Sequence, residues 1–235
     1  MTDGEAPGDT LVIAIDGPSG TGKSSVAREV ARRLGAGYLD TGAMYRALTV
    51  AVLRDNLDPA DIEAVAARAE NLQITIDTDP DMEKVVADGC DVTQEIRSPE
   101  ATASVSAVSA IPAVRRLLLA EQRRLARGSA MVVEGRDIGT VVFPSAHIKI
   151  YLSAAPAARA TRRADQLGIT RPEEIAALAE SLRARDEWDS TRAESPLRPA
   201  PDAVLLDSTQ LSKLAVVEAI LAEVRSRAGS SEVRR

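Results

Sequence analysis

Apolar residues recur along this chain with two spacings that alternate from one end to the other. Short, nearly continuous apolar runs are typical of strands buried on both faces of a sheet, and such runs lie at 11–16, 129–135, 146–152 and 202–208. Between them the apolar positions recur with the helical period, which predicts helices over 23–34, 41–54, 59–70, 99–108, 112–127, 156–166, 172–188 and 211–227. Strands that alternate with helices indicate an α/β protein whose parallel sheet is covered by helices on both faces.

One segment departs from this alternation and predicts a small antiparallel β unit. In LQITIDT (72–78) the apolar side chains alternate, and the Asp-Pro-Asp that follows is a turn signal. The short runs EKVVADG, CDVT and QEIRSP come next, and we interpret them as short strands joined by turns. The expected division is a core of 10–70 and 98–227, an inserted β unit of 71–97, and disordered tails at 1–9 and 228–235.

Composition and charge narrow the class of protein. A net charge of -6 and a pI near 5.0 argue against general nucleic-acid binding. No apolar run approaches a membrane span, and the acidic start MTDGEAPGD is unlike a signal peptide, so we expect a cytoplasmic protein. The single cysteine, Cys90, excludes an intrachain disulfide, and the single histidine, His147, is interpreted as a strand-edge residue rather than a catalytic base. All but four of the 29 basic residues are arginines, which reflects either a coding bias or a need for bidentate phosphate ligands.

A glycine loop between the first strand and its helix is the clearest chemical signal. The stretch GPSGTGKSS (17–25) fits GxxxxGK[ST]. Backbone N–H groups of such a loop wrap a phosphate chain, and the following helix N-terminus adds a favourable dipole. We expect Lys23 to reach the β- and γ-phosphates of ATP and the Ser24 hydroxyl to hold Mg²⁺. The residues expected to bind ATP are Gly17, Pro18, Ser19, Gly20, Thr21, Gly22, Lys23, Ser24 and Ser25.

Three acidic residues end apolar segments near the carboxyl edge of the expected sheet. They are Asp16, Asp40 and Glu134. We expect one or more to orient Mg²⁺ or its water ligands, with Asp40 and Glu134 ahead of Asp16. The alternative is that each caps a helix or pairs with an arginine.

The rest of the chain favours a small-molecule kinase over a nucleotide hydrolase. The NKxD motif of GTPases is missing, and the loop lies close to the N-terminus of a small chain. A kinase holds two anionic substrates end to end and needs positive charge away from its P-loop. Arg46, Arg136 and the arginines between 151 and 201 supply it, and Arg159 and Arg163 share one helix face at i and i+4. A solvated helix face would show the same spacing.

Five motifs in order resemble those of the bacterial cytidylate kinases. They are GPSGTGKSS, YLDTGAMYR, EGRDIGTVVFP, ARATRR and RDEWDSTR, and the resemblance covers about 10–227, including the β insert. It implies a P-loop kinase fold with an arginine-rich lid at about 155–170. It also implies transfer of the γ-phosphoryl group of ATP to CMP or dCMP, with Mg²⁺.

The resemblance further implies roles for individual residues. CMP recognition falls on Ser106, Arg115 and Asp137 with Thr41 beside them, Asp189 and Arg192 match positions near the ribose and phosphate, and Arg46 and Arg136 match phosphate-binding positions. Arg159, Arg162 and Arg163 match the lid, and the residues expected to act in catalysis are Lys23, Arg136, Arg159 and Arg163. Two departures, Thr41 where some members carry Ser and Glu134 where some carry Asp, leave the function intact and the geometry open.

Other functions remain open at this point. The chain could be another small P-loop kinase, acting on a different nucleoside monophosphate, on shikimate or on gluconate. It could also be a nucleotide-binding regulatory module without turnover, or a scaffold for a partner of the β insert. We expect a monomer whose partners are small molecules, without nucleic acid or membrane.

Overall fold

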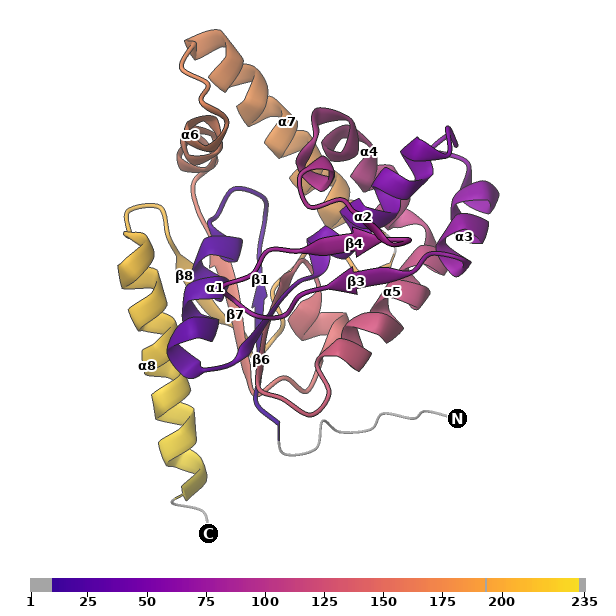
Figure 1. Ribbon diagram of the computed structural model, residues 1–235. Coiled ribbons are helices and arrows are strands. Elements are labelled where there is room, and N and C mark those ends of the chain that lie inside the picture. The colour runs from indigo at the N-terminus through magenta and orange to yellow at the C-terminus, as the bar shows by residue number, and fades with distance from the viewer. Residues whose placement is uncertain (1–9, 193, 233–235) are drawn as a thin grey trace.

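The computed structural model describes residues 10–192 and 194–232, so the expected tail at 1–9 and the last three residues of the expected tail at 228–235 lie outside that range. A central parallel sheet runs through the molecule in the strand order β2-β6-β1-β7-β8 (Figure 1). Its strands are β1 (Val12–Asp16), β2 (Gly37–Asp40), β6 (Met131–Gly135), β7 (Ile148–Ser153) and β8 (Val204–Asp207). Because parallel strands share one carboxyl edge, the register sets Asp16 opposite Gly135 and Asp40 opposite Glu134.

Helices cover both faces of the sheet, as the alternating pattern predicts. One face is covered by α1 (Lys23–Leu34) and α8 (Lys213–Glu232), and the other by α2 (Thr41–Arg54), α3 (Ile62–Glu70), α4 (Pro99–Ala110) and α5 (Pro112–Leu125). Successive side chains of a strand point to opposite faces. In β1, Ile13 and Ile15 accordingly pack under α1 and α8, whereas Val12 and Ala14 pack under the other layer.

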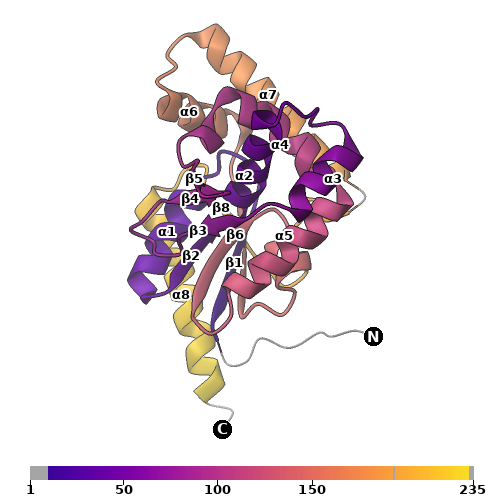
Figure 2. The same cartoon turned by 45° about the vertical axis from the view of Figure 1, so that its right-hand side comes forward.

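A second, antiparallel sheet lies beside α2. It consists of β3 (Ile74–Ile76), β4 (Val85–Ala87) and β5 (Cys90–Asp91), followed by a short 3-10 helix, η1 (Glu95–Arg97). Val85, Ala87 and Ile96 pack on Ala43 and Ala47 of α2, so this sheet buries one face against the core (Figure 2).

Two helices project beyond the carboxyl edge of the central sheet (Figure 1). They are α6 (Pro156–Leu167) and α7 (Pro172–Thr191), which pack against each other as a hairpin. Gly168 ends α6 in the left-handed conformation, with φ of 66°. This hairpin contains the segment expected to form a lid.

The structure differs from the sequence expectations in local features. Strand β2 was not expected, because its four residues follow directly on the glycines that end α1 and pair in the central sheet with β6 alone. The QEIRSP segment was expected as a strand, and this was wrong: it forms η1 and the N-cap of α4, where Ser98 Oγ accepts from the Ala101 amide at 3.1 Å. The backbone of α8 is helical through Glu232, beyond the expected end at 227. A π-helix, η2 (Ile138–Val142), follows β6 and was not expected either.

Candidate active site

The P-loop lies between β1 and α1 and depends on glycine at two positions. At Gly17 a Cβ atom would lie 2.1 Å from the Leu152 carbonyl oxygen of the neighbouring strand. At Gly22, the N-cap of α1, φ is 93°. The loop leads directly into the N-terminus of α1, where a phosphate chain would gain from backbone N–H donors and the helix dipole.

Groups from other elements hold the loop from outside. Arg136, just after β6, donates to the Gly17 carbonyl oxygen at 3.1 Å. From the α6–α7 hairpin, Arg159 donates to the Ser19 carbonyl oxygen at 3.0 Å, and Asp186 accepts from the Ser19 amide at 3.3 Å. Segments far apart in the sequence thus fix the conformation of the loop.

Lys23 and Glu134 form the charged centre beneath the loop. Lys23 Nζ donates to the Pro18 carbonyl oxygen at 2.7 Å, and burial together with Arg136 lowers its pKa to about 7. Burial and the neighbouring Asp40 raise the pKa of Glu134 to about 7, against hydrogen bonds from Ser24 and Tyr38. Lys23 and Glu134 partly compensate each other, but burial outweighs this in both, so a nucleotide with its counterion would stabilise their charged forms.

Asp16 and Asp40 both cap helices, and Asp16 does so with both carboxylate oxygens. Its two oxygens accept from the amides of Ile138 and Gly139 at 2.8 and 2.7 Å, so it caps η2. The helix-capping alternative therefore holds for Asp16. Asp40 caps α2 with one oxygen, Oδ1, which accepts from Ala43 at 3.0 Å.

The donors around Glu134 fit Mg²⁺ as a nucleotide-bound ion. Within residues 10–192 and 194–232, no cluster of three or more His, Cys, Asp or Glu side chains forms an all-protein metal cage. Mg²⁺ is usually held by one or two protein oxygens together with substrate phosphates and water. Glu134, with Ser24 as a hydrogen-bond partner and Asp40 as a neighbouring carboxylate, provides such a partial set of oxygen ligands.

Arg115 and Asp137 form a buried ion pair on the other side of β6. Each is about 6% exposed, and Arg115 Nη2 donates to Asp137 Oδ2. Arg115 also donates to the Ser109 carbonyl oxygen at 3.2 Å and lies over the ring of Tyr45 at 5.6 Å. Ser106 lies on α4 one turn before Ser109, whose hydroxyl donates to the Ser106 carbonyl oxygen at 3.1 Å. The structure thus brings these predicted residues to one place.

Thr41 links this region to the end of β6. Its hydroxyl donates to the Glu134 carbonyl oxygen at 2.8 Å. The hydroxyl is therefore already engaged by the backbone, and it fixes the start of α2 against the strand that carries Glu134.

A group of arginines lies between the P-loop and the ion pair. Arg46 donates to Thr102 Oγ1 at 3.1 Å, and Arg136 donates through Nε to Asp189 Oδ2 at 3.0 Å. Burial, then Arg136 and Arg46, lower the pKa of Arg185 to about 9. The buried Nε of Arg185 has no hydrogen-bond partner in the described part of the chain. Cations that lower one another's pKa form a site for an anion.

Asp189 organises the far end of this group. It is buried, and it contacts Arg192 at 3.7 Å as well as Arg136. Arg192 in turn donates to the Ser195 carbonyl oxygen at 3.1 Å. Both residues belong to the C-terminal end of α7, so the helix hairpin contributes directly to the site.

The lid arginines point in different directions. Arg159 pairs with Asp186 and contacts the P-loop, whereas Arg162 donates to the Ser208 carbonyl oxygen at 2.6 Å and ties α6 to the end of β8. Arg163 donates to Gln166 Oε1 at 3.2 Å on its own helix; burial and Arg97 of the insert lower its pKa, and its charge helps to lower that of Arg46.

Sequence reasoning gave no individual role to Arg185, Asp186 or Tyr38, although Arg185 was among the arginines between 151 and 201 expected to supply positive charge. Arg185, Asp189 and Arg192 are spaced i, i+4 and i+7 and share one face of α7, so helical spacing would have found Arg185. Tyr38 donates to Glu134 Oε1 at 2.6 Å, and only the register of β2 beside β6 reveals that contact.

A P-loop and a second cationic site at the same edge of a parallel sheet define a P-loop kinase that acts on a small anionic acceptor. The cytidylate kinase family matches this chain over residues 13–226. The chain is 55% identical to the cytidylate kinase of Rhodococcus opacus over 222 residues, which are 94% of this chain and 97% of that protein. It is 50% identical to the cytidylate kinase of Mycolicibacterium paratuberculosis, over 96% of this chain and 98% of that protein.

The chain therefore belongs to the cytidylate kinase family, and it is an ATP-dependent phosphotransferase that acts on CMP. Among solved structures, an uncharacterized protein from Eubacterium ventriosum has a TM-score of 0.51 at 11% identity, over 92% of this chain and 99% of that one. At that identity the likeness shows the fold alone.

No single helix in the described ranges is both long and apolar enough to cross a bilayer, and the bent pair Pro99–Ala110 and Pro112–Leu125, at 96°, passes such a test only by length and composition.

Proposed function

We propose that the P-loop of this protein, Gly17 to Ser25, holds ATP and that the arginine group beside it holds the phosphate of CMP or dCMP. The observation that carries this proposal is the group formed by Arg46, Arg136 and Arg185 beside the P-loop: Arg136 donates to the Gly17 carbonyl oxygen at 3.1 Å, and burial, then Arg136 and Arg46, lower the pKa of Arg185. An acceptor phosphate between them would relieve this repulsion. The same edge of the sheet carries Lys23, so donor and acceptor meet end to end.

The Arg115–Asp137 pair supports recognition of cytosine. Cytosine presents an N4 amino donor and the acceptors N3 and O2. The second oxygen of Asp137 accepts from N4, while Arg115 donates to N3 or O2, with Ser106 and Thr41 bordering the same pocket. Uracil would place an acceptor against the carboxylate, and a buried polar group without a match is a strong basis for rejecting a substrate.

Asp189 and Arg192 are assigned to the ribose and its phosphate. Asp189 is held between Arg136 and Arg192, so its carboxylate is fixed before substrate arrives. A fixed acceptor costs little entropy on binding. The proposal includes both ribose and deoxyribose acceptors, because base and phosphate contacts supply most of the recognition.

Phosphoryl transfer at this site needs alignment and charge stabilisation more than a strong base. The acceptor oxygen is already anionic, so no proton has to be removed from it. Lys23 and the P-loop amides stabilise the β- and γ-phosphate oxygens, and Arg136 stands between donor and acceptor through its contacts with Gly17 and Asp189. Arg159 and Arg163 complete the set from the lid.

Ser24, with Asp40 or Glu134 through water, is assigned to Mg²⁺. The bound ion would neutralise charge on the β- and γ-phosphates. This chain orients the protein oxygens that would hold the ion, because Glu134 receives hydrogen bonds from both Ser24 and Tyr38.

Closure of the α6–α7 hairpin over the nucleotides completes the proposed cycle. Arg159 already contacts the P-loop through Ser19, and Arg163 lies on the same helix, near enough to Arg97 of the insert for that charge to lower its pKa, after burial. Excluding water protects ATP from hydrolysis while the acceptor site is empty. We further propose a cytoplasmic monomer with small-molecule partners and without nucleic-acid or membrane partners, in keeping with ATP and CMP as substrates and with the net charge of -6.

A coupled assay of ADP release tests this function. Purified protein with ATP and Mg²⁺ is given CMP, dCMP, UMP and AMP in parallel, and CMP and dCMP are expected to give the highest kcat/KM. Lys23→Met serves as the inactive control. Equal kcat/KM values for CMP, UMP and AMP would contradict the assignment of the cytosine pocket.

A further inference from the structure

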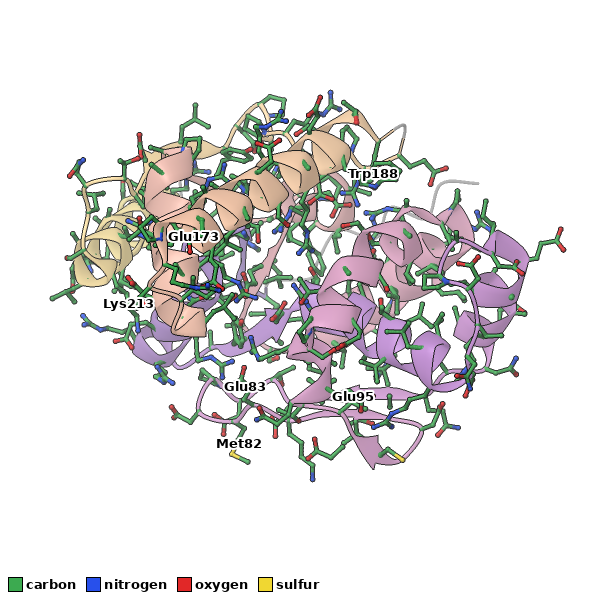
Figure 3. The ribbon with its side chains drawn as sticks, turned by 90° about the horizontal axis from the view of Figure 1, so that it is seen from above. Met82, Glu83, Glu95, Glu173, Trp188 and Lys213 are labelled. Atoms are coloured by element: carbon green, nitrogen blue, oxygen red, sulfur yellow. The ribbon has the colours of Figure 1, made fainter. Side chains whose placement is uncertain are left out.

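The inserted sheet reaches past α2 and touches the P-loop helix. Its turn, residues 79–83, lies on α1, where Arg28 Nη1 donates to the Met82 carbonyl oxygen at 2.8 Å and to that of Pro80 at 3.3 Å. Arg32, one turn further along α1, bonds Asp81 at 2.6 Å and the Pro80 carbonyl oxygen at 3.1 Å. Figure 3 shows Met82 at the outer side of this turn, whereas Glu83 points inward, where it contacts Arg28 and Arg97. The insert is therefore anchored to the helix that begins at Lys23.

Arg28 connects this turn to a buried tyrosine. Its guanidinium lies over the ring of Tyr38, 4.7 Å from the centroid, and it contacts Glu83 at 3.5 Å. Tyr38 is 3% exposed, and its backbone amide donates to the carbonyl oxygen of Thr78, the last residue before the turn. The insert thus contacts Tyr38 through the backbone and, through Arg28, on the face of the ring.

The Tyr38 hydroxyl contacts the carboxylate of Glu134 in the charged centre. It donates to Glu134 Oε1 at 2.6 Å, and Glu134 is itself 3% exposed beside Lys23 and Ser24. Burial and Glu134 raise the pKa of Tyr38, so the hydroxyl keeps its proton and stays a donor. A phenylalanine would fill the same space, which means that the hydroxyl is required only for the bond to Glu134.

We propose that Tyr38 is a positioning residue that aims Glu134 at the nucleotide-bound Mg²⁺ and Ser24, and that the turn of the insert holds Tyr38 in place through Arg28. The insert then acts on the ATP half of the site as well as on the CMP half. This inference rests on the role assigned to Glu134 under the proposed function. The CMP kinase activity of the wild-type protein is measured first, and its absence would contradict the proposed function. The variants are then compared with the active wild type, and that comparison tests the positioning role separately.

Tyr38→Phe removes the hydroxyl alone. A hydrogen bond to a charged, buried group is lost, and we expect kcat to fall about 10- to 100-fold with the KM for CMP changed less than about twofold. Calorimetry supplies a readout without turnover. In the presence of Mg²⁺, ADP should bind about 10-fold more weakly to the variant than to wild type, whereas in EDTA it should bind to both with the same affinity. A kcat within twofold of wild type, or a Mg²⁺ effect on ADP affinity equal to that of wild type, overturns the proposal.

Arg28→Gln and Arg32→Gln are a matched pair that isolates the path through the tyrosine. Both remove an arginine of α1 that bonds the turn, and only Arg28 lies over the Tyr38 ring. We expect a fall in kcat of about 3- to 10-fold for Arg28→Gln and less than about twofold for Arg32→Gln. Equal effects of the two variants, or no effect of either, would show that the turn does not act through Arg28.

A double-mutant cycle covers the case in which an arginine variant fails to fold. Tyr38→Phe is combined with Glu134→Ala, and the Mg²⁺ effect on ADP binding is measured for the single and double variants. If the hydroxyl acts through Glu134, Tyr38→Phe changes that effect less than about twofold in the Glu134→Ala background. The same loss in both backgrounds overturns the assignment.

Discussion

Asp137→Asn is the change that addresses substrate choice most directly. Removal of the whole side chain, as in Asp137→Ala, would leave the Arg115 guanidinium buried without a counter-charge. That loss costs about 3–5 kcal/mol of folding free energy and would mix stability with recognition. Asparagine keeps the volume and one oxygen, so Arg115 still has an acceptor and keeps its contacts with Ser109 and Tyr45.

The expected magnitude follows from how the amide must lie. The guanidinium of Arg115 carries only donors, so it holds the amide oxygen of Asn and turns the Nδ2 group toward the base. Cytosine N4 then faces a donor and loses a charge-assisted bond worth about 1.5–3 kcal/mol, which is about 10- to 100-fold in kcat/KM. Uracil O4 gains a donor worth about 1 kcal/mol, or about fivefold. The ratio of kcat/KM for CMP to that for UMP should therefore fall about 100-fold.

The assay is ADP release with CMP and with UMP under equal conditions, together with thermal unfolding of each variant. Asp189→Asn is the matched control, because it makes the same chemical change at another buried carboxylate that is paired with arginine. It should lower kcat/KM for both acceptors and leave their ratio within about twofold. If Asp137→Asn folds and its CMP-to-UMP ratio equals that of wild type, the pair does not read the base.

Features encoded in consecutive residues were predictable from the sequence. The P-loop joins a buried strand to a helix; a Cβ at Gly17 would clash with the Leu152 carbonyl oxygen, and Gly22 has a φ of 93°, which favours glycine. The alternation of runs and helices also predicted the layered parallel sheet, because a strand buried on both faces has to be apolar throughout. The cores on the two sides of β1 confirm that reasoning.

Contacts between segments far apart in the sequence could not be predicted from local sequence patterns. Arg115 and Asp137 were named together through the resemblance, whereas their direct pairing across 22 residues is visible only in the fold. The bond from Tyr38 to Glu134 spans 96 residues and depends on β2, which is too short to stand out in the sequence. The alternation in the insert predicted a β unit, and nothing in it indicated that its turn would lie on α1.

Charge that is poorly compensated in the free protein motivates the remaining predictions. Arg163→Ala should lower kcat far more than it raises the KM for CMP, since the lid arginine acts at the transition state, and a change in KM alone in steady-state kinetics would contradict this. Arg185→Met should raise the KM for CMP at least about 10-fold without lowering the melting temperature, because it removes a cation that its neighbours repel; an unchanged KM would remove Arg185 from the phosphate site. Burial raises the pKa of Asp16 from 3.8 to about 6. Below pH 3.8 the Asp16 carboxyl is protonated in both the folded and the unfolded chain. Between pH 3.8 and 6 it is ionised in the unfolded chain and still protonated in the folded one, so the free energy of unfolding falls as the pH rises. About 2 pKa units correspond to about 3 kcal/mol. The free energy of urea unfolding of Asp16→Asn minus that of wild type should therefore increase by about that amount from pH 4 to pH 7, whereas a difference independent of pH would show that Asp16 is ionised in the folded protein throughout this range.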